Sequence, residues 1–273
     1  MYPSAMLKTR KVLLGLIAGV LIFLTMLYFL QEKLIFLPSK LPVNYSYSFE
    51  EPFEEFFLTT DDGAKLNALH FKRENPYGVI LYFHGNAGDL SRWGQVVQYF
   101  VKLNYDVVVM DYRTYGKSTG SLSELALLSD AQLFYKYVSE RYKEEEIILY
   151  GRSLGTAMAS YLVSIHTPSL LVLETPFYSL LDVAQDRFPI LPLNSLLKYK
   201  FKSYQYLQSA NCPILILHGD QDRVVSILSS EKLYLSLEGK EAEYIIIEGG
   251  EHNNLSAFQT YRDAIDSLLI SDR

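Results

Sequence analysis

Cysteine is nearly absent from this sequence, which has a single one, Cys212, among 273 residues. One cysteine excludes an intramolecular disulfide and a cysteine-based zinc cluster. Cys212 stands at the head of the apolar run NCPILILHG, where we expect it to be a small buried residue. An excess of basic residues is also missing, because 25 Lys and Arg stand against 31 Asp and Glu, for a net charge of −6. Without a basic stripe to displace counterions from phosphates, a nucleic-acid ligand is disfavoured.

Charge is absent from one long segment near the N-terminus. Residues 12–30, VLLGLIAGVLIFLTMLYFL, carry no charged side chain. At about 1.5 Å per residue, a helix of this length matches a hydrocarbon core about 30 Å thick. Bulky side chains follow it where a cleaved signal peptide would have small ones, so an uncleaved membrane anchor is predicted. Lys8, Arg10 and Lys11 precede the segment, and the positive-inside rule then predicts an extracytoplasmic location for the rest of the chain.

Three parts are expected along the chain: a membrane anchor over residues 1–34, a linker over 35–52 and one large domain over 53–273. The linker holds several prolines and is predicted to lead off the membrane surface in an extended conformation. A hairpin should open the large domain, with strands at 54–59 and 65–72 around the turn Asp61-Asp62-Gly63.

The large domain then alternates between apolar strand-like runs and helical segments. Runs that are apolar at almost every position are typical of parallel strands buried on both faces. Alternation with helices predicts an α/β fold with a mainly parallel, doubly wound sheet, whose working groups gather at the carboxyl ends of the strands. The strand runs are YGVILYFHG, YDVVVMD, EIILYG, LLVLE, PILILHG and AEYIIIE, and the helical segments are 91–103, 122–142, 156–166, 227–237 and 255–269.

One long segment, about residues 175–211, interrupts this alternation. It is too long for a simple crossover, so we expect a cap over the carboxyl edge of the sheet. Its many apolar side chains, from Phe177 to Phe201, would either favour a hydrophobic substrate or pack the cap onto the domain.

A serine between two glycines follows the strand run EIILYG. The stretch Gly151-Arg152-Ser153-Leu154-Gly155 fits G-x-S-x-G, with a helical segment rich in small residues after it. Such a stretch forms a sharp turn that lifts the serine hydroxyl above the sheet, with room only for glycine on either side. Ser153 is therefore predicted to be a nucleophile.

A serine nucleophile needs a base to take its proton and an acid to orient that base. Asp220 and Asp222 follow one strand run in LHGDQDRVV, and His252 follows the last one in EGGEHNNL. The chain order Ser153, Asp, His252 is that of α/β-hydrolases. Spacing alone leaves the choice between the two aspartates open.

Five motifs together resemble the α/β-hydrolase superfamily, in its serine-aminopeptidase-like and acyl-hydrolase branch. They are YFHGNAGD, MDYRTYGKSTG, YGRSLGTA, HGDQDRVV and GGEHNNL, and the resemblance covers about residues 50–270. It implies an α/β-hydrolase fold with a cap insertion, with Asp222 as the acid and Asp220 as a loop residue. It also implies an oxyanion hole built from the backbone amides of Leu154 and Asn86, with Ala87 as the alternative to Asn86.

The chain departs from the resemblance at Thr114, where a glycine is common, and this predicts a loop without positive φ there. Nearby, Asp111 and Arg113 could be a catalytic pair, although a buried ion pair is the preferred interpretation. His84 and His218 are expected to bond loop backbone, and His70 and His166 to be surface or packing residues. Asp61 and Asp62 lack the neighbours of a metal site and are assigned to the turn.

The predicted function is cleavage of an ester or thioester bond through a Ser-His-Asp triad and an acyl-enzyme, with no metal and no cofactor. The expected substrate is a small hydrophobic acyl ester, thioester or amide. One alternative is a serine peptidase or aminopeptidase with the same triad. It would need acidic residues to hold a substrate amine, and the cap offers only Asp182 and Asp186. Another alternative is a catalytically silent, membrane-bound binding module.

Overall fold

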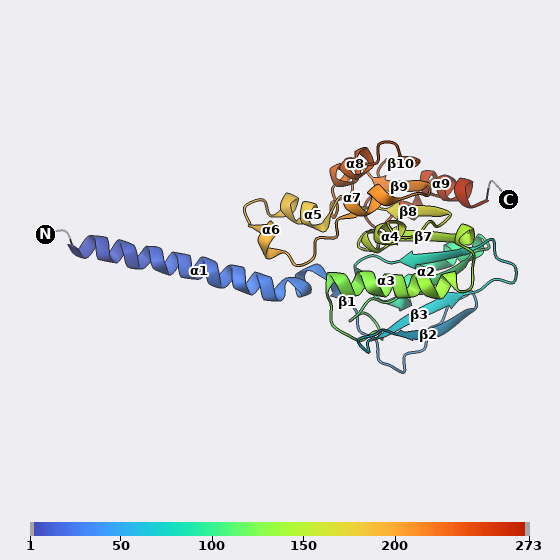
Figure 1. The fold of residues 1–273 in the computed structure, drawn as a ribbon, viewed down its shortest axis with the longest axis horizontal. Helices are drawn as coiled ribbons and strands as arrows, with labels where there is room; N and C mark the ends of the chain where they lie inside the picture. The colour runs from blue at the N-terminus through green and yellow to red at the C-terminus, as the bar shows by residue number, and fades with distance from the viewer. Residues whose placement is uncertain (1–2, 271–273) are drawn as a thin grey trace.

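A long helix projects from an α/β domain in the computed structural model, which describes residues 3–270 and the side chains of residues 9–269 (Figure 1). Residues 1–2 of the predicted anchor and 271–273 of the predicted large domain lie outside the described residues. The helix, α1 (Pro3–Ile35), contains a segment, Thr9–Ile35, that is long and apolar enough to cross a membrane, with a mean hydropathy of 2.6. None of residues 12–30 is buried, unlike the residues of a core helix in a soluble domain.

The domain is built on an eight-stranded sheet with the order β10-β9-β8-β7-β4-β6-β3-β2. The hairpin strands β2 and β3 are antiparallel, β3 is antiparallel to β6, and all other pairs are parallel. This is the predicted mainly parallel sheet. The strands are β2 (Phe53–Thr59), β3 (Lys65–Phe71), β4 (Val79–Phe83), β6 (Asp106–Met110), β7 (Ile147–Arg152), β8 (Leu170–Glu174), β9 (Ile214–Gly219) and β10 (Ala242–Ile247).

Each face of the sheet is covered by its own set of helices. In β4, Val79, Leu81 and Phe83 join the core on one face, and Ile80 and Tyr82 join the core on the other. This period of two, in a strand with no exposed residue, explains why the strand runs are apolar throughout. The first core includes α3 (Glu124–Ser139), α4 (Gly155–Val163) and α8 (Ile227–Leu235), and the second includes α2 (Leu90–Lys102) and α9 (Gln259–Ile270).

The segment after α1 lies against the domain. One residue past the helix, β1 (Leu37–Pro38) pairs in parallel with β5 (Ala87–Gly88), in the loop that follows β4. Further on, Lys40 forms a bridge with Gly116. The segment that follows α1 is therefore hydrogen-bonded to the loops at the carboxyl edge of the sheet.

The cap lies between β8 and β9 and flanks the last turns of α1 (Figure 1). Its inner side chains Phe177, Tyr199 and Phe201 are buried in the domain core, which bears out a packing role for part of the apolar set. At its tip Ile190 is 95% exposed. The cap consists of α5 (Leu180–Arg187), α6 (Leu193–Leu196), α7 (Ser203–Tyr206) and the 3₁₀ turn η2 (Leu207–Ser209); further 3₁₀ turns are η1 (Glu144–Glu146) and η3 (Leu255–Ala257).

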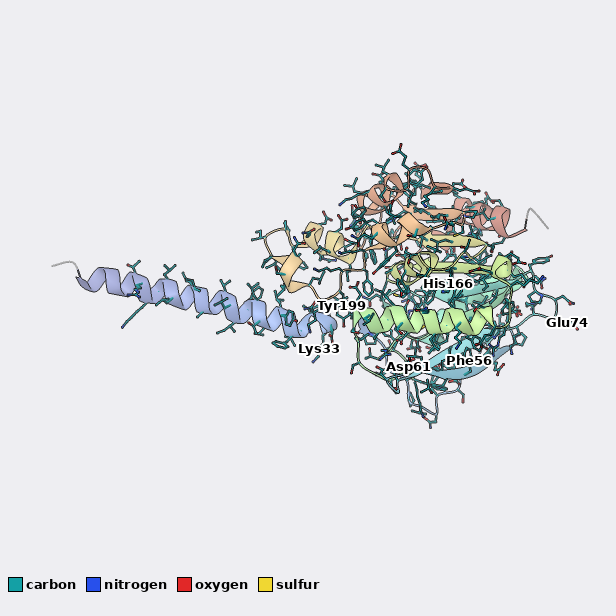
Figure 2. All side chains as sticks on the ribbon, viewed as in Figure 1. Lys33, Phe56, Asp61, Glu74, His166 and Tyr199 are labelled. Atoms are coloured by element: carbon teal, nitrogen blue, oxygen red, sulfur yellow. The ribbon has the colours of Figure 1, made fainter. Side chains whose placement is uncertain are left out.

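Direct hydrogen bonds join the cap to α1. The Gln31 side chain donates to the Leu196 carbonyl at 3.1 Å and accepts from the Lys198 amide at 2.8 Å. The Tyr199 hydroxyl donates to Glu32 at 3.0 Å, and Figure 2 labels Tyr199 at this junction. The cap and the helix therefore form one structural unit at the edge of the domain.

Two expectations for the loop after β6 are wrong. Thr114 has φ 72°, because it is the third residue of a turn closed by a hydrogen bond from the Tyr115 amide to the Tyr112 carbonyl. Arg113 does not pair with Asp111. Its guanidinium instead binds Asp130, with Nε 2.7 Å from Oδ2, and also contacts Asp62 of the hairpin turn. The ion pair is buried as predicted, but its partners come from α3 and the turn.

A smaller correction concerns the last predicted helix, 255–269. It is divided into the 3₁₀ turn η3 and the helix α9, and the break falls at Phe258, which has an extended backbone.

Candidate active site

Ser153 occupies a strained turn between β7 and α4. Its φ is 50°, in the left-handed region that a non-glycine residue rarely adopts. A Cβ at Gly155 would lie 1.9 Å from the Phe83 carbonyl oxygen, and one at Gly151 would lie 2.6 Å from the Thr156 Cα. Only glycine fits on either side of the serine, which is the steric requirement of a nucleophile elbow.

Three predicted site residues meet at the carboxyl edge of the sheet. Ser153 follows β7, Asp222 follows β9 and His252 follows β10. The Oγ of Ser153 is 2.9 Å from Nε2 of His252, and Nδ1 of His252 is 2.6 Å from Oδ2 of Asp222. A neutral imidazole that carries its proton on Nδ1 satisfies both bonds, donating to the carboxylate and accepting from the hydroxyl.

The Asp222 carboxylate is fully buried and surrounded by donors. Its Oδ1 accepts from the amides of Val224 and Val225, and its Oδ2 lies 3.2 Å from Nε2 of His218 as well as against His252. Burial acts to raise the pKa of Asp222, but the hydrogen bonds from His218 and His252 outweigh it and hold the pKa below its usual range. The carboxylate is therefore charged at neutral pH.

Asp220 points elsewhere. Its Oδ1 accepts from the Gly249 amide at 2.8 Å, which ties the loop after β9 to the loop after β10. The structure brings Asp222, and not Asp220, to the imidazole.

The two predicted oxyanion amides belong to residues that line the cavity over Ser153, as does the alternative, Ala87. Leu154 follows the serine directly, and Asn86 lies in the loop between β4 and β5. Among the hydrogen bonds within residues 3–270, none uses the amide of Leu154 or of Asn86 as a donor. Both N–H groups are thus available to an oxygen placed in the cavity.

The Asn86 side chain has a second role, which the sequence did not reveal. Its Nδ2 donates to the Ile35 carbonyl at the end of α1, and its Oδ1 accepts from the Leu37 amide at 3.2 Å and from the Tyr115 hydroxyl at 2.7 Å. The loop that carries a candidate oxyanion donor is therefore bonded to the end of the long helix.

Arg152 and Glu174 form a buried ion pair beside the catalytic residues. Arg152 Nε is 3.2 Å from a Glu174 oxygen, and its Nη2 donates to the His252 carbonyl at 3.3 Å. Glu174 also accepts from the Tyr150 hydroxyl at 2.6 Å. This buried ion pair holds the backbone of the histidine loop against β7, a contact between segments about a hundred residues apart that sequence spacing did not predict.

The cavity over Ser153 has a volume of about 400 Å³, which is in the range of small-molecule sites. Leu34, Ile35 and Leu37 reach into its lining from the α1 end of the chain. Three arginines, Arg92, Arg152 and Arg187, also line it, whereas none of the described lining residues is Asp or Glu.

The remaining histidines have structural contacts. His84 Nδ1 lies 2.7 Å from the Gly85 carbonyl and its ring stacks on Trp93, while His218 Nε2 is 3.1 Å from the Val225 carbonyl, so both bond loop backbone as predicted. His70 is buried between Tyr137 and Tyr142, and the His166 ring stacks on Tyr135. Nε2 of His218 also lies 3.2 Å from the Asp222 carboxylate. The sequence did not predict this contact.

The strand order and the serine turn at the carboxyl edge define the α/β-hydrolase fold. Residues 74–206 and 183–256 match the family described as serine aminopeptidase, S33, and the chain belongs to this family.

Relatives and a solved structure are consistent with this membership. The chain is 31% identical to the uncharacterized membrane protein YNL320W of Saccharomyces cerevisiae, covering 96% of this chain and 97% of the yeast protein. It is 28% identical to the lysophosphatidylserine lipase ABHD12 of Danio rerio, covering 88% of this chain and 77% of the relative. The structure of the Pyrococcus furiosus esterase Pf2001 superposes with a TM-score of 0.69 at 20% identity, over 86% of this chain and 96% of the esterase.

Proposed function

We propose that the protein is a serine hydrolase that cleaves an ester or thioester bond through an acyl-enzyme. One observation carries the proposal: the His252 imidazole lies between the Ser153 hydroxyl and the buried Asp222 carboxylate, within hydrogen-bond distance of both. Nucleophile, base and orienting acid are then in the arrangement that acyl transfer requires.

In the proposed reaction, His252 Nε2 accepts the proton of Ser153 as Oγ attacks the acyl carbonyl. The negative charge that develops on the carbonyl oxygen is stabilised by the amides of Leu154 and Asn86. His252 then returns the proton to the leaving alcohol or thiol, and the acyl group stays on Ser153. A water molecule, activated by His252 in the same way, releases the acid. Asp222 keeps the imidazole in the required tautomer throughout.

The cavity lining favours an acyl ester over a peptide with a free amino group. A substrate ammonium needs a carboxylate partner, and the described lining has arginines instead. Asp182, one of the two acids in the cap, is bound to Lys232 at 2.5 Å and accepts from Ser229 at 2.7 Å, and neither it nor Asp186 lines the catalytic cavity. The aminopeptidase alternative is therefore the weaker one, although the family carries that name.

A hydrophobic acyl substrate fits the apolar residues that α1 and the cap contribute to the cavity. The name of the zebrafish relative, a lysophosphatidylserine lipase, supports the same class of substrate. The apolar helix and the yeast membrane protein relative support a single-pass anchor formed by α1. We place the catalytic domain on the extracytoplasmic side. In sealed vesicles whose cytoplasmic face points outward, added protease should leave the domain intact, and its digestion there would reverse this orientation.

The test of the chemistry is Ser153→Ala in the full chain. Hydrolysis of p-nitrophenyl acetate should fall to the background rate, and the melting temperature should stay near that of the wild type. A fluorophosphonate probe should label the wild type and not the variant. Undiminished hydrolysis by the variant would refute the nucleophile assignment, and a wild type that neither hydrolyses esters nor reacts with the probe would favour the silent binding module.

A further inference from the structure

A second cavity, which we call the anchor groove, lies between α1 and the cap, with a volume of about 410 Å³. Phe23 and Leu27 of α1 form one wall, and Phe188, Leu191 and Leu196 of the cap form the other. Its lining contains one polar residue, Gln31, whose side-chain amide is already hydrogen-bonded to the cap backbone. The groove therefore offers an almost purely apolar surface.

The anchor groove adjoins the catalytic cavity. Leu34, Ile35, Ala184 and Leu197 line both, so the two spaces share a wall made of the end of α1 and two residues of the cap. A flexible apolar chain attached to a carbonyl at Ser153 could pass along this shared wall. The other groups around Ser153, including Arg92 and Arg187, remain on the catalytic side.

The anchor groove also extends to the depth of the membrane that α1 would span. Phe23 and Leu27 belong to the uncharged stretch of α1, and the charged residues Glu32 and Lys33 follow it. At about 1.5 Å per residue, Phe23 lies roughly 18 Å along the helix from Ile35. One end of the groove is thus at the level of lipid tails, and the other end is at the catalytic cavity.

The cap tip beside the groove is also apolar and exposed. Phe188, which lines the groove together with α1, is 51% exposed, and Ile190, two residues further on, is 95% exposed. Clustered exposed apolar side chains beside a membrane span are typical of a surface covered by lipid.

We propose that the anchor groove holds the acyl chain of a membrane-embedded ester, so that the chain enters sideways from the bilayer with α1 as one wall of its binding site. The inference rests on the proposed function, because the carbonyl at the inner end of the chain is cleaved at Ser153. The occupant is one acyl chain, because the wall shared by the groove and the catalytic cavity is apolar, whereas the arginines that could hold a polar group line only the catalytic cavity.

The test uses the full chain in phosphatidylcholine vesicles with acetyl, butyryl, octanoyl and palmitoyl esters of p-nitrophenol. Leu27→Trp and Leu191→Trp each fill the groove from one wall. Each buried methylene strengthens binding about fourfold, so the loss of room for two or three methylenes should lower kcat/KM for the palmitoyl ester about 16-fold to 60-fold. The acetyl ester should be cleaved at the wild-type rate, which also shows that each variant is folded.

Matched controls place the same side chain outside the groove. Leu21→Trp lies on the exposed surface of α1, and Ile190→Trp lies at the exposed cap tip; neither residue lines either cavity. Both should retain wild-type rates on all four esters. A groove variant that loses the acetyl and palmitoyl activities equally, or that loses neither, would overturn the inference.

The outcomes separate this inference from the proposed function. If acetyl ester hydrolysis depends on Ser153 but the groove variants leave palmitoyl hydrolysis unchanged, the groove holds something else, such as a structural lipid or the helix of a second copy, and only the inference fails. If the wild type cleaves no ester, the proposed function fails and the inference fails with it.

Discussion

The triad and the anchor groove contrast in how they are built. Ser153, Asp222 and His252 each follow a strand of one sheet, and buried partners such as Arg152 and His218 hold them in place. The groove is made of one helix that projects from the domain and a cap whose tip is largely exposed. The reacting groups are thus positioned by the densely packed part of the molecule. The surface that would select a substrate is positioned by a few contacts between distant segments.

Among the residues that position the reacting groups, the largest effect should come from the acid of the triad. Asp222→Asn should lower kcat for p-nitrophenyl acetate by about 10⁴-fold, because the amide no longer holds the imidazole with its proton on Nδ1. The matched variant Asp220→Asn should stay near the wild-type rate, since the Asp220 carboxylate bonds the Gly249 amide and not the imidazole. A large loss in Asp220→Asn, with little loss in Asp222→Asn, would reverse the assignment of the acid.

Asp222→Asn should also change how the stability of the protein depends on pH. Because the folded-state pKa of Asp222 is lowered, its ionisation contributes stability above its unfolded pKa of about 3.9, and this contribution is lost as the pH falls below that value. The melting temperature of the wild type should therefore decrease more steeply below about pH 4 than that of Asp222→Asn. Parallel curves for the two proteins would show that the carboxylate is not stabilised by folding.

An intermediate effect is expected at Asn86, where the two regions meet. Asn86→Ala keeps the backbone amide but removes the side-chain bonds to the α1 end and to Tyr115. A displaced oxyanion donor should lower kcat by about 10²-fold with little change in KM. Tyr115→Phe, which removes only one of these bonds, should lose much less. Equal losses in both variants would indicate that Tyr115, and not the α1 end, positions the loop.

The smallest effect on catalysis should come from the contact between α1 and the cap. Gln31→Ala removes two hydrogen bonds to the cap backbone, which contribute about 1 kcal/mol each. The state in which the cap is detached from α1 should therefore become about 30-fold more populated. The acetyl ester should be cleaved at close to the wild-type rate. In detergent micelles, trypsin should cut the cap at Arg187 and Lys198 faster than in the wild type. Thr25→Ala, whose hydroxyl bonds only to its own helix, is the control.

The sequence predicted the sheet and the site through local patterns. Apolar runs marked the strands, and the glycines of G-x-S-x-G marked the turn at Ser153 because no other residue fits there. The resemblance, and not spacing, selected Asp222 over Asp220. The positive φ of Thr114 was missed because a threonine in that conformation gives no signal of its own.

The anchor groove could not be predicted from such patterns. Gln31 and Leu196 are 165 positions apart, and hydrogen bonds from a side chain to a distant backbone leave no periodicity in the sequence. The helix α6 has four residues, too few for a helical pattern to be visible. The Asn86 side chain was overlooked for a similar reason, since the sequence drew attention to its amide.

Only Phe36, itself buried, separates the end of α1 from the strand that pairs with the Asn86 loop, so the helix has almost no slack relative to the domain. A spanning helix changes its tilt when the bilayer becomes thinner or thicker. With α1 as the proposed membrane anchor, such a change in tilt would be transmitted to the loop beside Ser153, and the thickness of the bilayer would then set the position of a candidate oxyanion donor.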